Sequence, residues 1–116
     1  MKNCVSLNFE VMTDTKYCYE TMPELVDAII QSVDRQFVVY HEDNIDQPIV
    51  ENSRTKYVVS GKRSFEAAKG YPGKKVAVLN FANNHTVGGS PFKAGAQEES
   101  LCRCSTLYPC LEAMKR

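Results

Sequence analysis

Two adjacent glutamates, Glu98 and Glu99, are the side chains with the clearest capacity for chemistry in this chain. A carboxyl group can donate a proton to a leaving group and later accept one from water. Successive helical residues point about 100° apart, so the two carboxyl groups would not face each other and each would have its own task. The structural alternative is that acidic side chains in a first helical turn are stabilised by the helix dipole. A glutamate acting as general acid there needs a closed, largely apolar pocket, because burial favours its protonated form.

The segment before the glutamates has the composition of a ligand-binding loop. Residues 76–81 form a nearly continuous apolar run, which predicts a buried strand, and Asn80 interrupts it near its end. Asn80 is either satisfied by backbone at the strand end or contacts a ligand, since open α/β sheets bind ligands at the carboxyl ends of their strands. The Gly88–Gly89 pair allows positive φ angles and the close approach of a ligand, but such pairs also occur in ordinary turns.

Hydrophobic patterning predicts the elements that position these residues. A strand, a helix and a strand between residues 57 and 81 suit a right-handed βαβ unit, and residues 41–52 are polar enough to predict a loop. The predicted strands span residues 5–11, 37–40, 57–60 and 75–81, and the predicted helices span 23–35, 64–69, a segment starting near Ala96, and 109–115.

Cysteine and histidine usage argues against a zinc site. The chain has five cysteines, an odd number without a secretion signal, so we expect no disulfide framework. Cys102, Cys104 and Cys110, with His85, raise a zinc alternative, but a Cys-x-Cys pair on a helix points its thiols about 200° apart. We therefore expect buried thiols that act as small hydrophobic groups. Neither His41 nor His85 has a spaced partner for nucleophilic catalysis.

Composition and charge describe one soluble domain. A length of 116 residues fits a single domain over residues 1–116, and a net charge of zero gives no basic surface for DNA or an anionic membrane. No apolar run approaches the roughly 20 residues of a membrane span, and no signal-peptide core opens the chain. We expect a cytoplasmic protein that binds neither DNA nor membranes.

The spacing of these motifs resembles that of a known enzyme family. The order N-F-A-N, then G-G-x, six residues, then Q-E-E is similar to the signature of poly(ADP-ribose) glycohydrolases. The run E-S-L-C-R-C-S-T-L-Y-P and the upstream V-S-G-K-R-S-F-E-A-A-K resemble the microbial branch of that family. The resemblance extends from about residue 13 to the end and is strongest over residues 57–111. It implies an α/β, macrodomain-like fold, a mixed sheet flanked by helices, that binds ADP-ribose or poly(ADP-ribose).

The resemblance also implies roles for individual residues. Glu99 matches the catalytic glutamate, which protonates the departing ribose oxygen and then assists the attack of water. Glu98 matches the neighbouring glutamate, which orients the ribose hydroxyls and Glu99. No metal or cofactor is implied. The expected substrate-binding residues are Asn80, Asn83, Gly88, Gly89 and Gln97.

Two departures from the family pattern leave the function open. The third glycine of the family is Ser90 here, followed by Pro91, and serine before proline does not take positive φ angles freely. The chain ends at Arg116, whereas the family fold continues well beyond the Q-E-E helix, so we expect the N-terminal part of such a domain with a sheet incomplete at its C-terminus. The hypotheses are a hydrolase that cleaves ribose–ribose O-glycosidic bonds, a non-catalytic ADP-ribose-binding module, and an inactive truncated fragment.

Overall fold

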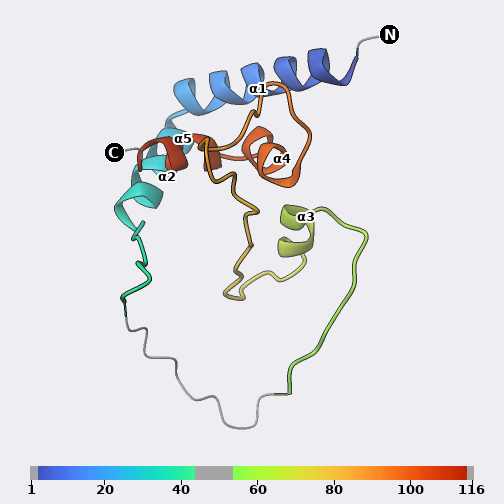
Figure 1. Cartoon of the computed structure of the whole chain (residues 1–116), viewed down its shortest axis with the longest axis vertical. Helices are drawn as coiled ribbons and strands as arrows, with labels where there is room; N and C mark the ends of the chain where they lie inside the picture. The colour runs from blue at the N-terminus through green and yellow to red at the C-terminus, as the bar shows by residue number, and fades with distance from the viewer. Residues whose placement is uncertain (1–2, 44–53, 115–116) are drawn as a thin grey trace.

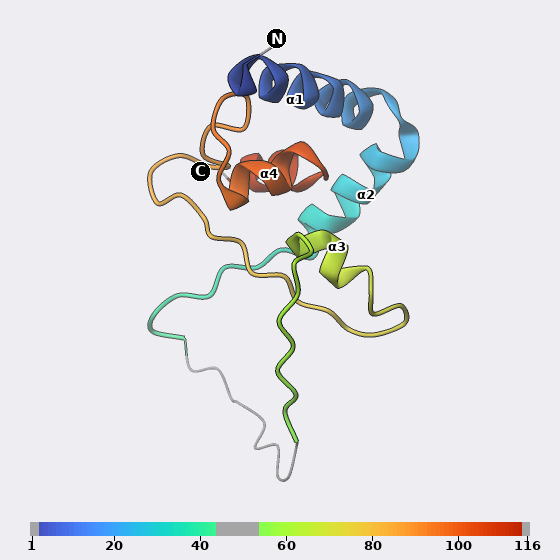
Figure 2. The ribbon, with the colours of Figure 1, turned by 90° about the vertical axis from the view of Figure 1, so that its right-hand side faces the viewer.

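The computed structural model describes residues 3–43 and 54–114, and within them the chain forms five helices. Helix α1 packs against α2 and α4, and α5 packs against the same two helices. In both ribbon views α1 lies over α4, while α3 stands at the edge of this group beside the long connecting segments (Figures 1 and 2). The helices are α1 (Cys4–Thr21), α2 (Pro23–Asp34), α3 (Ser64–Ala68), α4 (Gln97–Arg103) and α5 (Leu107–Glu112).

The predicted mixed sheet of an α/β, macrodomain-like fold is wrong for the described residues, which contain no strand. Residues 37–40, 57–60 and 75–81 follow irregular paths, and side chains such as Tyr57, 92% exposed, face solvent. A strand completes its backbone hydrogen bonds only by pairing with a neighbouring strand. No such ladder joins these three segments within the described ranges, so their apolar composition does not produce a sheet.

Helix α1 replaces the strand predicted over residues 5–11. Asn3 caps it by accepting the backbone N–H of Ser6 on its Oδ1 at 2.8 Å. Met12 and Tyr19, two turns apart, are its buried residues. The alternating apolar residues that suggested a strand, including Phe9, remain largely exposed around the helix. A helix satisfies its own backbone, which an unpaired strand cannot do.

The other helix predictions are confirmed with small shifts. Helix α2 ends one residue earlier than expected and has Pro23 at its start, where the missing N–H removes no helical hydrogen bond. Helix α4 begins at Gln97, directly after its N-cap Ala96. Helix α5 starts before Pro109 and holds this proline in its first turn. The predicted loop over residues 41–52 lies largely outside the described residues.

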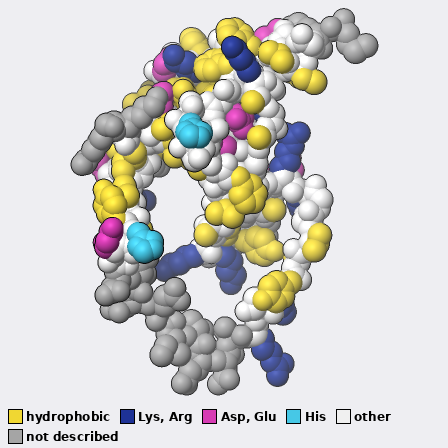
Figure 3. Space-filling model, in the orientation of Figure 1, with side chains coloured by type: hydrophobic (Ala, Val, Ile, Leu, Met, Phe, Trp, Pro, Cys, Tyr) yellow, Lys and Arg dark blue, Asp and Glu magenta, His cyan; other side chains and the backbone are white. Residues whose placement is uncertain are grey.

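The core is small and is centred on α1, α4 and α5. Two acidic side chains, Glu98 and Glu99, are buried with it. Figure 3 shows apolar side chains at the surface of both the helices and the extended segments. None of the helices described is both long and apolar enough to cross a bilayer. The buried apolar residues of the helices are Met12, Tyr19, Leu101, Cys102 and Cys110.

Candidate functional site

Glu98 joins two points of the preceding segment to α4. Its Oε1 accepts a hydrogen bond from Nδ2 of Asn80 at 3.1 Å, and its Oε2 accepts one from the backbone N–H of Asn83 at 2.7 Å. Only 3% of Glu98 is exposed, so these two donors stand in for water around a buried carboxylate. Glu98 thereby fixes residues 80–83 against the first turn of α4.

Asn83 extends this arrangement into the next turn. Its side-chain Oδ1 accepts the backbone N–H groups of His85 and Thr86, both at 2.9 Å. Asparagine often folds the chain in this way, because its short amide can bind backbone groups two and three residues ahead. Thr86 then accepts the N–H of Gly89 at 2.9 Å. The asparagine therefore directs the chain towards the glycine pair.

Gln97 holds residues 79–81 from the other side. Its Nε2 donates to the carbonyl of Leu79 at 2.8 Å, and its Oε1 accepts the N–H of Phe81 at 2.9 Å. A longer contact of 3.4 Å joins Nε2 to Oγ of Ser64 in α3. Both ends of the Gln97 amide thus bind the protein itself.

The glycine pair passes close to α4 and α5. Gly88 and Gly89 have φ angles of 69° and 64°, which glycine adopts without steric cost. A side chain on Gly88 would overlap the ring of Tyr108, and one on Gly89 would overlap the carboxylate of Glu99. The sequence predicted that these glycines allow a ligand to come close; in the structure the groups that lie against them are protein side chains, and the ligand contact stays a prediction.

Glu99 lies under the end of this turn. It is 7% exposed, and its Oε1 accepts the backbone N–H of Ser90 at 3.2 Å. Within the described residues no hydrogen bond reaches its Oε2. The neighbouring carboxylates therefore differ: each oxygen of Glu98 has a protein donor, whereas in the described residues only one oxygen of Glu99 has one.

Asn80 carries an open acceptor beside Glu98. Its Oδ1 is buried and has no hydrogen-bond partner in the part of the chain described. Buried polar atoms without a partner are rare, and a ligand hydroxyl is one donor that would satisfy this oxygen. The amide nitrogen of Asn80 is held by Glu98 rather than by backbone, so the side chain is fixed in its orientation.

Sequence reasoning missed the residues that hold the loop after the glycine pair. Nη1 of Arg103 donates to the carbonyls of Pro91 and Ala94, both at 2.6 Å. Nδ2 of Asn8 in α1 donates to the carbonyl of Lys93 at 3.1 Å. The only signal in the sequence was a basic residue in the last turn of α4, which by itself indicates no more than a favourable dipole interaction.

Cys102 is fully buried beneath the two glutamates. Burial, followed by the charges of Glu98 and Glu99, raises the pKa of its thiol to about 12. The residue therefore stays a neutral thiol at ordinary pH. Across the described ranges, no group of three or more His, Cys, Asp or Glu side chains is placed to hold a metal ion.

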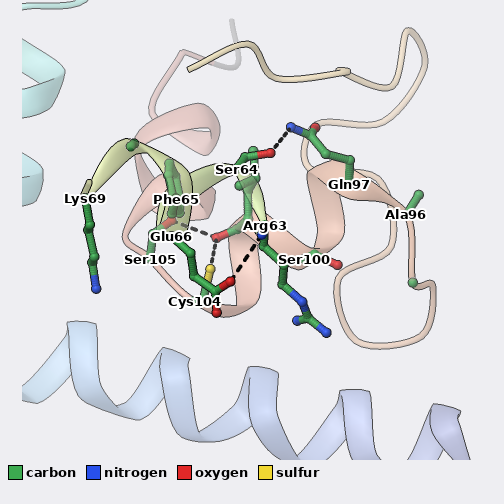
Figure 4. Close-up of a pocket in the computed structure, with 13 residues that line it drawn as sticks. Arg63, Ser64, Phe65, Glu66, Lys69, Ala96, Gln97, Ser100, Cys104 and Ser105 are labelled. Carbon is green, nitrogen blue, oxygen red and sulfur yellow. Dashed lines mark hydrogen bonds between the residues drawn. The ribbon is translucent and has the colours of Figure 1, made fainter. Parts of the chain in front are cut away.

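A cavity of about 980 Å³ lies between α3 and α4 (Figure 4). Gln97, Ser100 and Leu101 line it from α4, whereas neither Glu98 nor Glu99 borders it. Residues 98 and 99 point to the other side of the helix, since their directions follow from 3.6 residues per turn. The closed apolar pocket expected around a catalytic glutamate is therefore not this cavity.

Comparison with known families identifies the class of this chain. The family model of the microbial-type PARG catalytic domain matches residues 8–116. The chain belongs to this family, the microbial-type poly(ADP-ribose) glycohydrolases, and the resemblance seen in its motifs is confirmed. No curated protein and no solved structure shows a significant match.

Proposed function

We propose that this chain hydrolyses the ribose–ribose O-glycosidic bonds of poly(ADP-ribose) or related ADP-ribose conjugates, with Glu99 as general acid and base. The observation that carries the proposal is the contrast between the two buried glutamates. Oε1 of Glu99 is fixed by the N–H of Ser90, while its second oxygen has no hydrogen bond from the described residues. A carboxyl group held at one oxygen and open at the other can transfer a proton in a defined direction.

The reaction needs one proton donor that later acts as a base. Protonated Glu99 gives its proton to the departing ribose oxygen as the glycosidic C–O bond breaks, and the bonding electron pair leaves with that oxygen. Positive charge develops on the anomeric carbon and the ring oxygen. Water then bonds to the anomeric carbon, and the Glu99 carboxylate removes its proton. The acid form of Glu99 is restored at the end of the cycle.

The surrounding residues supply position rather than protons in this proposal. Glu98 holds Asn80 and Asn83, and Gln97 holds residues 79–81, so the segment is ordered before substrate arrives. The open Oδ1 of Asn80 suits a ribose hydroxyl, which is a hydrogen-bond donor.

The test measures turnover and binding in the same variants. Glu99→Gln should lower the rate of ADP-ribose release from poly(ADP-ribose) by roughly 10²–10⁴-fold, the usual contribution of a general acid or base. Its ADP-ribose affinity, measured by calorimetry, should stay close to that of the wild type. Glu24→Gln, on the exposed surface of α2, is the matched control and should change neither quantity. Hydrolysis by Glu99→Gln at the wild-type rate would overturn the proposal.

A second candidate function is recognition of ADP-ribose without turnover. It is favoured by the absence of either glutamate from the lining of the cavity beside α4, because a general acid at this position needs an enclosed apolar site. In that case ADP-ribose would raise the unfolding temperature of the chain, since a ligand that binds only the folded state stabilises it. The wild-type chain would then release no ADP-ribose from the polymer.

A further inference from the structure

The ring of Tyr108 in α5 forms a floor under Gly88. A Cβ atom placed on Gly88 would lie 2.5 Å from Cδ2 and 2.8 Å from Cε2 of Tyr108, and 3.5 Å from Sγ of Cys102. Gly88 is buried, so this face of the turn rests on the aromatic ring and the thiol without intervening water. The sequence places Tyr108 only in an apolar helical stripe, which predicts no more than core packing.

The helix that carries Tyr108 is packed against other helices. Tyr108 is the second residue of α5, a helix that packs against α2 and α4. Nε2 of Gln36, just after α2, donates to the carbonyl of Cys110 at 3.2 Å and ties α5 to the end of α2. Burial, followed by its interaction with Glu112, raises the pKa of Tyr108, so the ring stays neutral. The position of the Tyr108 ring is therefore fixed by contacts that do not involve the Gly88–Gly89 turn.

The opposite end of the same turn reaches Glu99. A side chain on Gly89 would meet the carboxylate of Glu99, and the next N–H, that of Ser90, donates to its Oε1 at 3.2 Å. Gly88 is joined directly to Gly89 and Ser90, so a displacement of Gly88 would shift both of them relative to the carboxylate. The path of contact runs from the Tyr108 ring through three consecutive residues to Glu99.

We propose that Tyr108 is a positioning residue. Its ring fixes the position of the Gly88–Gly89 turn relative to α5, and through the turn it fixes the orientation of the Glu99 carboxylate. The effect on turnover rests on the proposed function, but the contact itself does not. The ring carbons are the atoms that lie against Gly88, so removal of the hydroxyl should leave this contact in place. The residue touches the turn and not the substrate.

A double-mutant cycle tests the contact by thermal unfolding of the full chain. Gly88→Ala introduces the same positive-φ strain with or without the ring, so the difference between backgrounds reports the ring contact alone. We expect the fall in Tm caused by Gly88→Ala to be about half as large, or smaller, in the Tyr108→Ala background than in the wild type. Equal falls in the two backgrounds would overturn the role of Tyr108.

Hydrolysis of poly(ADP-ribose) tests the consequence for Glu99. Tyr108→Phe should keep the wild-type kcat, whereas Tyr108→Ala should lower kcat by roughly 10²-fold with little change in KM, the effect of a misplaced catalytic group. Leu111→Ala, which shortens another side chain of α5, is the control for lost stability and should keep kcat. A kcat lost equally in Leu111→Ala and Tyr108→Ala would overturn the proposal.

The two proposals fail in different ways. A wild-type chain that releases no ADP-ribose overturns the proposed function, and the Tm cycle is unaffected by that result because it needs no substrate. An active wild type with equal Tm falls in both backgrounds leaves the proposed function standing and removes the role of Tyr108.

Discussion

Oε2 of Glu98 accepts the backbone N–H of Asn83 at 2.7 Å, and this contact fixes the start of the turn that ends over Glu99. The carboxylate is buried. Glu98 therefore holds the turn through both of its oxygens, while Oε2 of its neighbour Glu99 accepts no hydrogen bond from the described residues. This division of tasks between adjacent glutamates gives the first prediction.

Replacing Glu98 by methionine should loosen the turn. Glu98→Met keeps the length of the side chain but removes both acceptors, and a buried donor without a partner costs about 1–3 kcal/mol. Glu98→Gln is the matched control, because it can keep both contacts. Its single oxygen can accept the N–H of Asn83. Its new NH₂ group can donate to Oδ1 of Asn80 once the Asn80 amide rotates. Urea denaturation should show a smaller loss for Glu98→Gln. Equal losses would mean that acceptor geometry is not what stabilises the turn.

Gln97→Glu should make the free energy of unfolding depend on pH between 4 and 7. At neutral pH one oxygen of the new carboxylate would face the carbonyl of Leu79, which now accepts Nε2 of Gln97 at 2.8 Å. The folded state then favours the protonated acid, which can donate to that carbonyl, so the pKa of the new group rises above its unfolded value of about 4.3. The unfolding free energy should be low at pH 7 and recover by about 1 kcal/mol as pH falls towards 4.

The control for this change is Gln97→Ala, which removes both hydrogen bonds and adds no titratable group. Its loss of stability relative to the wild type should be the same at pH 4 and pH 7. If Gln97→Glu shows no recovery on acidification, the contact between residue 97 and the carbonyl of Leu79 does not contribute to stability.

Arg103→Lys should expose the loop after the glycine pair to protease. One guanidinium nitrogen binds the carbonyls of Pro91 and Ala94, and a lysine ammonium lacks the planar geometry that presents such donors. Trypsin should then cut several-fold faster after the exposed Lys93, because cleavage needs local opening. Mass spectrometry of early digestion products measures this rate. Arg35→Lys, at the end of α2, should leave it unchanged, and the same increase in both variants would contradict the role of Arg103.

Alkaline pH should destabilise the chain through Cys102. Its pKa rises from 9.0 unfolded to about 12 folded, mainly by burial and then through Glu98 and Glu99. A raised folded pKa means that the unfolded state loses its proton first, so stability is complete below pH 9 and falls as pH rises towards 12. Tyr19, whose pKa rises from 10.0 to about 12 mainly by burial, adds to the loss above pH 10.

Denaturant unfolding at pH 8, 9 and 10 under reducing conditions measures this effect. Cys102→Ala should show a shallower fall of the unfolding free energy with pH than the wild type. Cys4→Ala removes an exposed thiol and should keep the wild-type slope. Identical slopes for the wild type and Cys102→Ala would show that this thiol is not the group responsible.

Local signals in the sequence predicted the helices better than the sheet. Pro23 followed by a 3.6-residue apolar pattern marked α2, and the acidic pair marked the start of α4. Residues 5–11 alternate as a strand would, yet they are helical, because the Asn3 cap and the burial of Met12 depend on contacts that alternation does not reveal. A strand also requires a partner elsewhere in the chain, and its presence cannot be read from the strand's own residues.

The sequence grouped the candidate site residues in one stretch, but it did not predict how they are arranged in space. The motif brought Asn80, Asn83 and Glu98 into one stretch, and the structure joins these three by hydrogen bonds. Which of their polar atoms are hydrogen-bonded depends on contacts between residues at least 15 positions apart in the chain. The spacing of a motif does not predict such contacts. The contributions of Arg103 and Tyr108 are of the same kind, since each acts on a loop that its own helix does not contain.

The bonds from Gln97 and Glu98 have a consequence for how the site orders. They close loops of 18 and 16 residues to Leu79 and Phe81, and of 18 and 15 residues to Asn80 and Asn83. The entropy of closing a loop grows only as the logarithm of its length, so the first of these bonds bears nearly the whole cost for all four. Once one has formed, the others add their enthalpy with little further loss of chain freedom. The segment from Leu79 to Asn83 should therefore order and open against α4 as one cooperative unit.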